Sequence, residues 1–125
     1  MKRPSYKELY NKIAKAKEAI SKERIYLLDQ DVIIIHALEL GYEVKEIDTV
    51  LLEHLEDITP QHYVGSYPPQ KSYEEGILNH DLFAFKVVSK RFGCDVYIKY
   101  VLKDENVWLV SFHQDRKKEQ ENEKS

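Results

Sequence analysis

The sequence predicts an α+β domain in which N-terminal helices pack on a C-terminal three-stranded antiparallel sheet. Three stretches, at about 6–21, 29–40 and 43–56, are predicted to be helices from their apolar spacing and capping residues. Three later runs, at 82–88, 96–102 and 107–113, are rich in β-branched and aromatic residues and are separated by turn residues. Because parallel strands need a long crossover, gaps this short indicate antiparallel neighbours.

The composition bounds the class of protein. The 125 residues are 42% hydrophobic and 33% charged, with a formal net charge of −3, which suits one globular domain. We expect a single domain over residues 1–113 and a disordered, wholly polar tail over 114–125. A lone cysteine and the lack of a signal-type or membrane-spanning apolar run predict a cytoplasmic protein without a membrane partner. The net charge disfavours binding of DNA or RNA through charge alone, although a local basic patch is permitted.

Two of the predicted helices have clear boundaries. The first runs from about Tyr6 to about Ser21, with Ser5 as N-cap and Glu8 completing a capping box. The other covers Glu43–Glu56, with acidic residues on one face and apolar residues on the opposite face. The apolar stripe expected on the first helix consists of Tyr6, Leu9, Tyr10, Ile13, Ala16 and Ile20.

The segment between these helices is less defined. Residues 25–28 form either a short strand or the start of a helix. Asp29 or Asp31 can cap a helix that ends at Leu40, with Gly41 just beyond its C-terminus.

The last hairpin decides which side chains share a face of the sheet. A three-residue loop at Asp104–Asn106 pairs Lys99 with Ser111 and Tyr97 with His113. A two-residue loop would shift the pairing by one residue and mix apolar with polar side chains, so the sequence predicts the longer loop. The core face then contains Val96, Ile98, Tyr100, Leu102, Trp108, Val110 and Phe112.

The opposite face of this hairpin bears Tyr97, Lys99, Ser111 and His113. Such residues usually only solvate the outer face of a half-buried sheet. The long segment from Ile58 to His80 fits no period and carries prolines, a glycine and tyrosines, which is typical of a functional loop. We therefore expect this loop to form the lip of a binding site beside the polar sheet face.

Several kinds of chemistry lack a motif in this sequence. It has no glycine-rich phosphate loop, no nucleophile elbow and no paired-cysteine metal site, and its histidines do not follow metal-ligand spacing. The polar sheet face suits RNA cleavage by transesterification, which requires no metal or cofactor. Histidine can transfer either proton, lysine can stabilise the charged phosphorane, and tyrosines can stack on bases.

The two closing strands also resemble a known family. Val96–Leu102 and Val107–His113 are similar to the C-terminal hairpin of the MqsR family, which reads much like V-Y-L-K and V-x-I-V-S-F-K. Ala37–Gly41, followed by an acidic helix and then Glu56-Asp57 and Tyr63, resembles the helical region ahead of that family's active-site loop. Members are bacterial toxin ribonucleases with a RelE-like fold. The resemblance implies an mRNA interferase, the toxin of a type II toxin–antitoxin system, with mRNA as substrate and a cognate antitoxin as partner.

Carried over by position, the resemblance places Tyr97 at the family's active-site tyrosine and His113 at its catalytic lysine. The family's loop lysine falls near Tyr63 and Val64, where this sequence has none, and Lys71 is the nearest lysine downstream. The expected catalytic residues are His113, Tyr97, Lys99, Lys71 and Tyr63. The expected substrate-binding residues are Ser111, His62, Tyr67 and His36.

A non-catalytic alternative remains open at the level of sequence. The same fold could bind a partner protein through its tyrosine-rich loop and sheet face. The negative net charge and the frequency of tyrosine at protein interfaces favour this reading.

Overall fold

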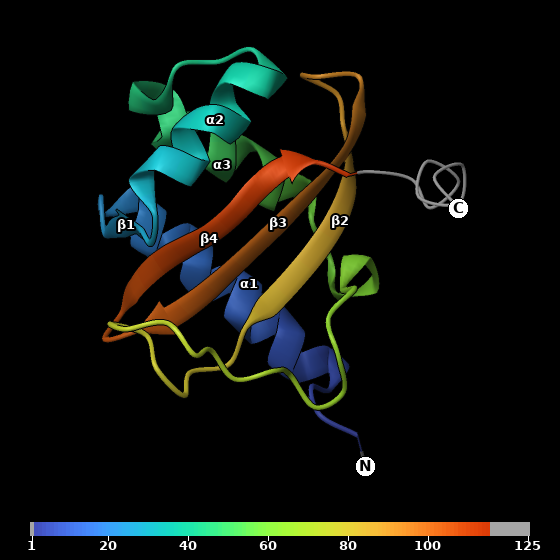
Figure 1. Ribbon diagram of the computed structural model, residues 1–125. Helices are drawn as coiled ribbons and strands as arrows, with labels where there is room; N and C mark the ends of the chain where they lie inside the picture. Colours follow the sequence, from blue (N-terminus) through green and yellow to red (C-terminus); the bar gives the residue numbers. More distant parts are fainter. Residues whose placement is uncertain (1, 116–125) are drawn as a thin grey trace, which may run out of the picture.

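A computed structural model describes residues 2–115 and contains helices and a four-stranded mixed sheet (Figure 1). The α+β class predicted from the sequence is confirmed. The elements are α1 (Tyr6–Ser21), β1 (Ile25–Leu27), α2 (Gln30–Leu40), η1 (Val44–Glu46), α3 (Ile47–Asp57), η2 (Pro60–His62), β2 (Phe83–Ser89), β3 (Cys94–Lys103) and β4 (Asn106–Gln114).

The prediction of a three-stranded, purely antiparallel sheet is wrong. The strand order is β1-β4-β3-β2, and the short strand β1 pairs with β4 in parallel, from Ile25 beside Val107 to Leu27 beside Leu109. Because these partners lie far apart along the chain, local spacing carried no sign of their pairing. The connections among β2, β3 and β4 are antiparallel, as expected.

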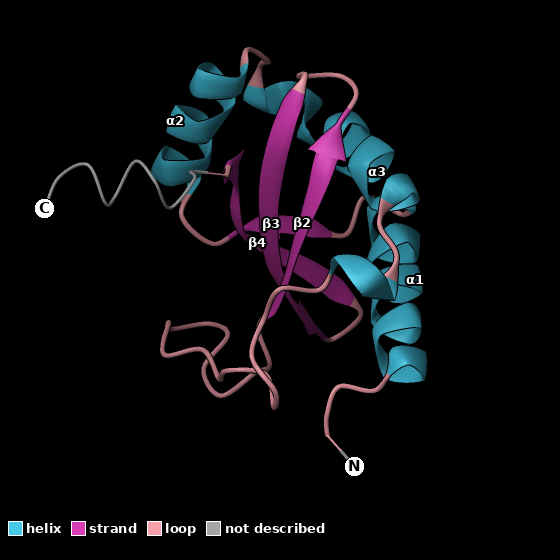
Figure 2. Cartoon of the chain, turned by 90° about the vertical axis from the view of Figure 1, so that its right-hand side faces the viewer, coloured by secondary structure: helices cyan, strands magenta, loops and turns pink. Residues whose placement is uncertain are grey.

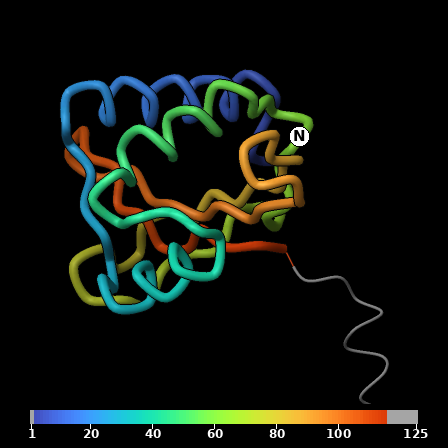
Figure 3. The backbone as a smooth tube through the Cα atoms, turned by 90° about the horizontal axis from the view of Figure 1, so that it is seen from above, coloured from blue at the N-terminus to red at the C-terminus, as the bar shows by residue number. Residues whose placement is uncertain are grey.

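The sheet is covered differently on its two faces. α1 and α3 pack on one face, whereas α2 and the loop between η2 and β2 lie on the opposite side (Figures 2 and 3). The main core fills the first interface, and the hydroxyl of Tyr100 donates across it to the carbonyl of Lys12 at 3.2 Å. Its fully buried side chains include Leu51, Leu55, Phe85, Ile98, Leu109 and Phe112.

The helix boundaries largely follow the predicted signals. Ser5 caps α1 by accepting a hydrogen bond from the Glu8 amide at 3.1 Å, while Asp29, not Asp31, caps α2. The predicted helix over 43–56 is divided into η1 and α3.

Two members of the stripe predicted on α1 do not enter the core. Tyr6 and Tyr10 are 63% and 66% exposed, because Leu9, Ile13 and Ala16 occupy the side of α1 that faces the sheet.

The register prediction for the last hairpin is correct at one end and wrong at the other. Lys99 pairs with Ser111 and Tyr97 with His113, as expected. The turn, however, contains only two residues, Asp104 and Glu105, both at positive φ. A β-bulge changes the register between Lys99 and Tyr100 and restores the expected pairing beyond it.

The bulge also changes which residues face the core. Val107 and Leu109 are fully buried, whereas Trp108 and Val110 are only partly buried, so assigning the latter two to the core face was wrong. Trp108 stacks on Tyr26 with ring centroids 5.0 Å apart.

The domain extends slightly beyond the predicted boundary. Gln114 belongs to β4 and pairs with Val96, so the predicted tail begins too early. The remainder of that tail, residues 116–125, lies outside the described residues. Within residues 2–115, no helix has the length and apolar character needed to cross a membrane.

The hairpin turn provides a test of this register. We expect Glu105→Gly to raise the free energy of unfolding by about 1 kcal/mol, because glycine adopts a φ of 64° without the steric cost borne by Glu105. Urea denaturation measures the change, with Glu75→Gln as an exposed control elsewhere. A loss of stability in Glu105→Gly would contradict the two-residue turn.

Candidate functional site

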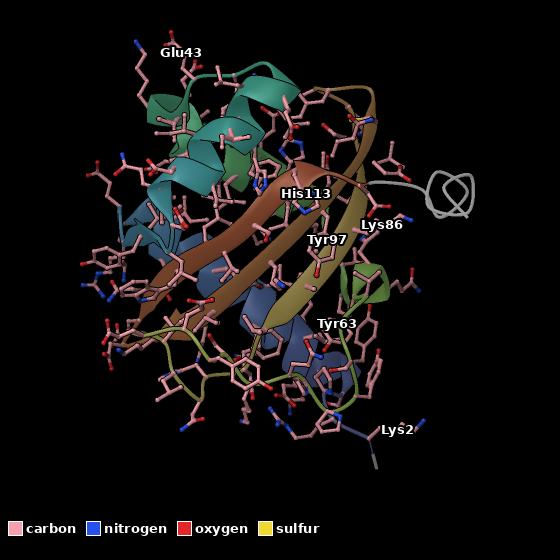
Figure 4. The ribbon with its side chains drawn as sticks, viewed as in Figure 1. Lys2, Glu43, Tyr63, Lys86, Tyr97 and His113 are labelled. Carbon is pink, nitrogen blue, oxygen red and sulfur yellow. The ribbon has the colours of Figure 1, made fainter. Side chains whose placement is uncertain are left out.

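The outer face of the sheet lies between α2 and the loop of residues 64–82, and cavities open on it at both ends; this region is here called the outer groove. Its floor consists of Ala84 from β2, Tyr97 and Lys99 from β3, and Ser111 and His113 from β4. Tyr97 and His113 lie side by side on the face turned to the viewer in Figure 4. The strand register therefore gathers four of the predicted site residues in one place.

Four side chains of the outer groove form a continuous row. His36 from α2 meets His113 edge to face, with ring centroids 4.8 Å apart. His113 stacks on Tyr97 at 5.3 Å, and the Lys99 ammonium lies 5.9 Å from the centre of the Tyr97 ring. This row places two imidazoles, a phenol and a cation beside one another.

The surroundings of His113 define its protonated nitrogen. Its Nδ1 lies 2.8 Å from the carbonyl oxygen of Gln114. Since a carbonyl can only accept a hydrogen bond, Nδ1 carries the proton and Nε2 carries the lone pair when the ring is neutral. His113 can therefore accept a proton through Nε2.

The hydroxyl of Tyr97 has the complementary property. Burial raises the pKa of Tyr97, and the nearby carboxylate of Asp115 raises this pKa further. The phenol consequently keeps its proton at neutral pH and can donate a hydrogen bond or a proton. Asp115 itself pairs with Lys86 at 3.2 Å, beside the same end of the sheet.

His36 lies beside the outer groove because the chain leaves the sheet at Leu28 and begins α2 there. The Leu28 amide donates to the carbonyl of Leu109, and Asp29 then caps α2. β1 covers only the first part of β4, so α2 can pack beside the second part and place His36 near His113. Ile35, His36, Glu39 and His113 line a hollow of about 380 Å³ at this end.

Tyr63, which was predicted to be catalytic, anchors the loop of residues 64–82, here called the loop wall. Tyr63 is 8% exposed, and its hydroxyl donates to the carbonyl of Ser66 at 2.6 Å. Burial raises its pKa to about 12. A Cβ on Gly65 would lie 2.5 Å from this hydroxyl, so the close packing requires glycine there. Tyr67 meets the Tyr63 ring edge to face, and the pair shapes the loop rather than the floor of the groove.

Two other predicted residues lie away from the row. Lys71 is on the loop, where its ammonium donates to Asp81 at 2.5 Å. His62 accepts a hydrogen bond from the Thr59 amide at 2.9 Å and lines a different cavity with Lys86. The structure thus groups His36, Tyr97, Lys99, Ser111 and His113, and separates His62 from them.

Sequence reasoning missed the residues that join the loop to the floor. Gln70 and Leu82 border two cavities that also reach Lys99. In the sequence, only the length of the loop and its prolines indicated that this part of the chain could border a site. Within residues 2–115, no group of three His, Cys, Asp or Glu side chains is arranged to hold a metal ion.

Comparisons with known proteins give no relative: no family model, no curated protein and no solved structure matches this chain. The MqsR resemblance therefore stays a prediction.

Asp81 connects the loop wall to the N-terminal region. Its carboxylate accepts hydrogen bonds from Arg3 at 2.8 Å and from Lys71 at 2.5 Å. Burial alone would raise the pKa of Asp81, but the hydrogen bonds from Arg3 and Lys71 outweigh it and lower the pKa below its ordinary value. Asp81 thus favours the folded loop only while it is ionised.

We expect Asp81→Asn to reduce the free energy of unfolding by about 1 kcal/mol near neutral pH. Since the folded-state pKa is lowered, the contribution of Asp81 is present above the unfolded pKa of about 3.9 and is lost as pH falls through the folded value. The difference between wild type and variant should therefore shrink at acid pH. Urea denaturation across pH measures it, with Glu75→Gln as a control, and a difference independent of pH would contradict this role.

Proposed function

We propose that this protein is a metal-independent endoribonuclease that cleaves mRNA by transesterification, acting as the toxin of a type II toxin–antitoxin pair. The observation that carries the proposal is the row of His113, Tyr97 and Lys99 on one open sheet face. A proton acceptor, a proton donor and a cation are the groups that this reaction needs.

The order of the row suggests a role for each group. Nε2 of His113 accepts the proton of a ribose 2′-hydroxyl, whose oxygen attacks the adjacent phosphorus. The bond from phosphorus to the 5′-oxygen breaks, and the Tyr97 hydroxyl donates a proton to that oxygen. Lys99 stabilises the negative charge that develops on the phosphorane. The products are a 2′,3′-cyclic phosphate and a 5′-hydroxyl.

His36 acts through His113 in this scheme. The two rings are in edge-to-face contact, so a phosphate cannot lie between them. His36 is therefore a positioning residue, which fixes the orientation of the His113 ring from the side opposite Tyr97.

The form of the site favours single-stranded RNA. Tyr73, which is 93% exposed, lines a cavity that reaches Lys99, and Tyr67 on the same loop is 51% exposed. Proteins commonly bind unpaired bases by stacking them on such rings. The toxin assignment rests on the MqsR resemblance, and it is supported by the contact between Tyr97 and residue 113, where the resemblance expects active-site groups.

A protein-interaction module is the second candidate function. The same exposed tyrosines suit a protein interface, and the chain's net charge of −3 opposes the accumulation of phosphate groups. Salt dependence separates the two candidates. RNA binding by lysine weakens steeply with added salt, whereas association through tyrosines with a protein partner changes little.

We expect His113→Ala to lower the rate of RNA cleavage by about 10²-fold or more, because it removes the proton acceptor. His36→Gln should cause a smaller loss, since only the orientation of His113 changes. The assay follows single-stranded RNA and identifies the cyclic phosphate product. His80→Ala, on the loop, provides a matched histidine control. Equal activity of wild type and His113→Ala, with both folded, would remove the proposed mechanism.

The phenol of Tyr97 can be tested without disturbing its ring stack. We expect Tyr97→Phe to keep the contact with His113 but to lower cleavage by about 10²-fold, because the donated proton is lost. Tyr26→Phe is the control, as Tyr26 stacks on Trp108 away from this row. If Tyr97→Phe kept full activity, the Tyr97 hydroxyl would not be the proton donor, and the ring would serve only in packing.

A further inference from the structure

The second half of the long loop is an ordered hairpin. Lys71 and Asp81 form an antiparallel bridge, the Leu82 amide donates to the Gln70 carbonyl, and the Ser72 amide donates to the His80 carbonyl. Ile77, within this hairpin, is fully buried, and the Lys103 ammonium donates to the carbonyl of Gly76. These contacts tie the backbone of the hairpin to itself and to the sheet.

Two cavities meet where this hairpin approaches Lys99. The smaller, of about 310 Å³, lies over Ala84 and Tyr97. The larger, of about 500 Å³, extends along the hairpin to Tyr73, Glu74 and Asn79. Gln70, Leu82 and Lys99 border both cavities. A phosphate held by Lys99 would thus have a separate recess on each side.

We infer that the larger cavity is a binding site for a nucleobase with an exocyclic amino group, in single-stranded RNA whose adjoining phosphate contacts Lys99. This inference rests on the proposed function, because it takes RNA as the substrate. It adds a base preference and assigns the residues that produce it.

The chemistry of the lining supports an amino-bearing base. Glu74 offers a carboxylate, which can only accept hydrogen bonds when ionised, and Gln70 and Asn79 offer amide groups. Lys71 also lines the cavity, but Asp81 already pairs with it, so the Glu74 carboxylate remains the acceptor for a base. An amino group of adenine, cytosine or guanine can donate to a carboxylate, whereas uracil has no such group.

Tyr73 supplies the stacking surface. It lines the same cavity and is 93% exposed, so no other part of the described chain covers its ring. Bases stack on exposed aromatic rings regardless of their identity. Tyr73 should therefore add affinity for any base, and Glu74 should add the preference among bases.

The test measures binding of 2′-fluoro pentanucleotides of adenine, cytosine or uracil to the full chain. These probes lack the 2′-hydroxyl nucleophile, so cleavage cannot interfere. We expect wild type to bind the adenine and cytosine probes about fivefold or more tightly than the uracil probe. Glu74→Gln should reduce this preference, while Tyr73→Ala should weaken all probes by about tenfold. Glu75→Gln and Tyr10→Ala are the matched controls.

The outcomes separate this inference from the proposed function. Equal binding of the three probes by wild type, no binding at all, or no effect of Glu74→Gln and Tyr73→Ala would overturn the nucleobase site. A retained preference in a protein that leaves ordinary RNA intact would support the site while removing the nuclease assignment. Cleavage of RNA without any preference in binding would support the nuclease assignment and overturn the nucleobase site.

Discussion

The pairing of β3 with β4 has to satisfy two requirements at opposite ends of the hairpin. At the turn, Asp104 and Glu105 form a two-residue connection that sets one register. At the far end, Phe112 must enter the core, which needs a register shifted by one residue. The β-bulge between these ends accommodates both. Without it, the alternation along β4 would turn His113 toward the core and Phe112 toward the solvent.

The parallel pairing of β1 with β4 determines what lies beside His113. β1 ends at Leu27, so it protects only the first part of the β4 edge. α2 packs against the rest and brings His36 into contact with His113. A short strand in the N-terminal half thus determines the composition of a site formed mainly by the C-terminal hairpin. The same contact assigns His36 a positioning role, since it excludes a phosphate from between the two rings.

The long loop between η2 and β2 is anchored to the rest of the domain at both of its ends. Tyr63 anchors its first part through Ser66, and Asp81 ties its second part to Arg3 and Lys71. Because these contacts occupy Tyr63 and Lys71 in structural roles, the groups that remain available beside Lys99 are different ones, including Gln70 and Glu74. The anchored loop and the sheet face together form the two recesses beside Lys99.

The sequence by itself determined the α+β class, the limits of α1, the three antiparallel strands and the shared face of Tyr97, Lys99, Ser111 and His113. These features follow from local spacing, capping residues and strand alternation, which act over a few residues. Only the tertiary structure decided the parallel strand β1, the bulge, the contact of His36 with His113 and the anchoring of the loop. Each of these depends on packing between segments far apart in the chain, and local patterns contain no record of such packing.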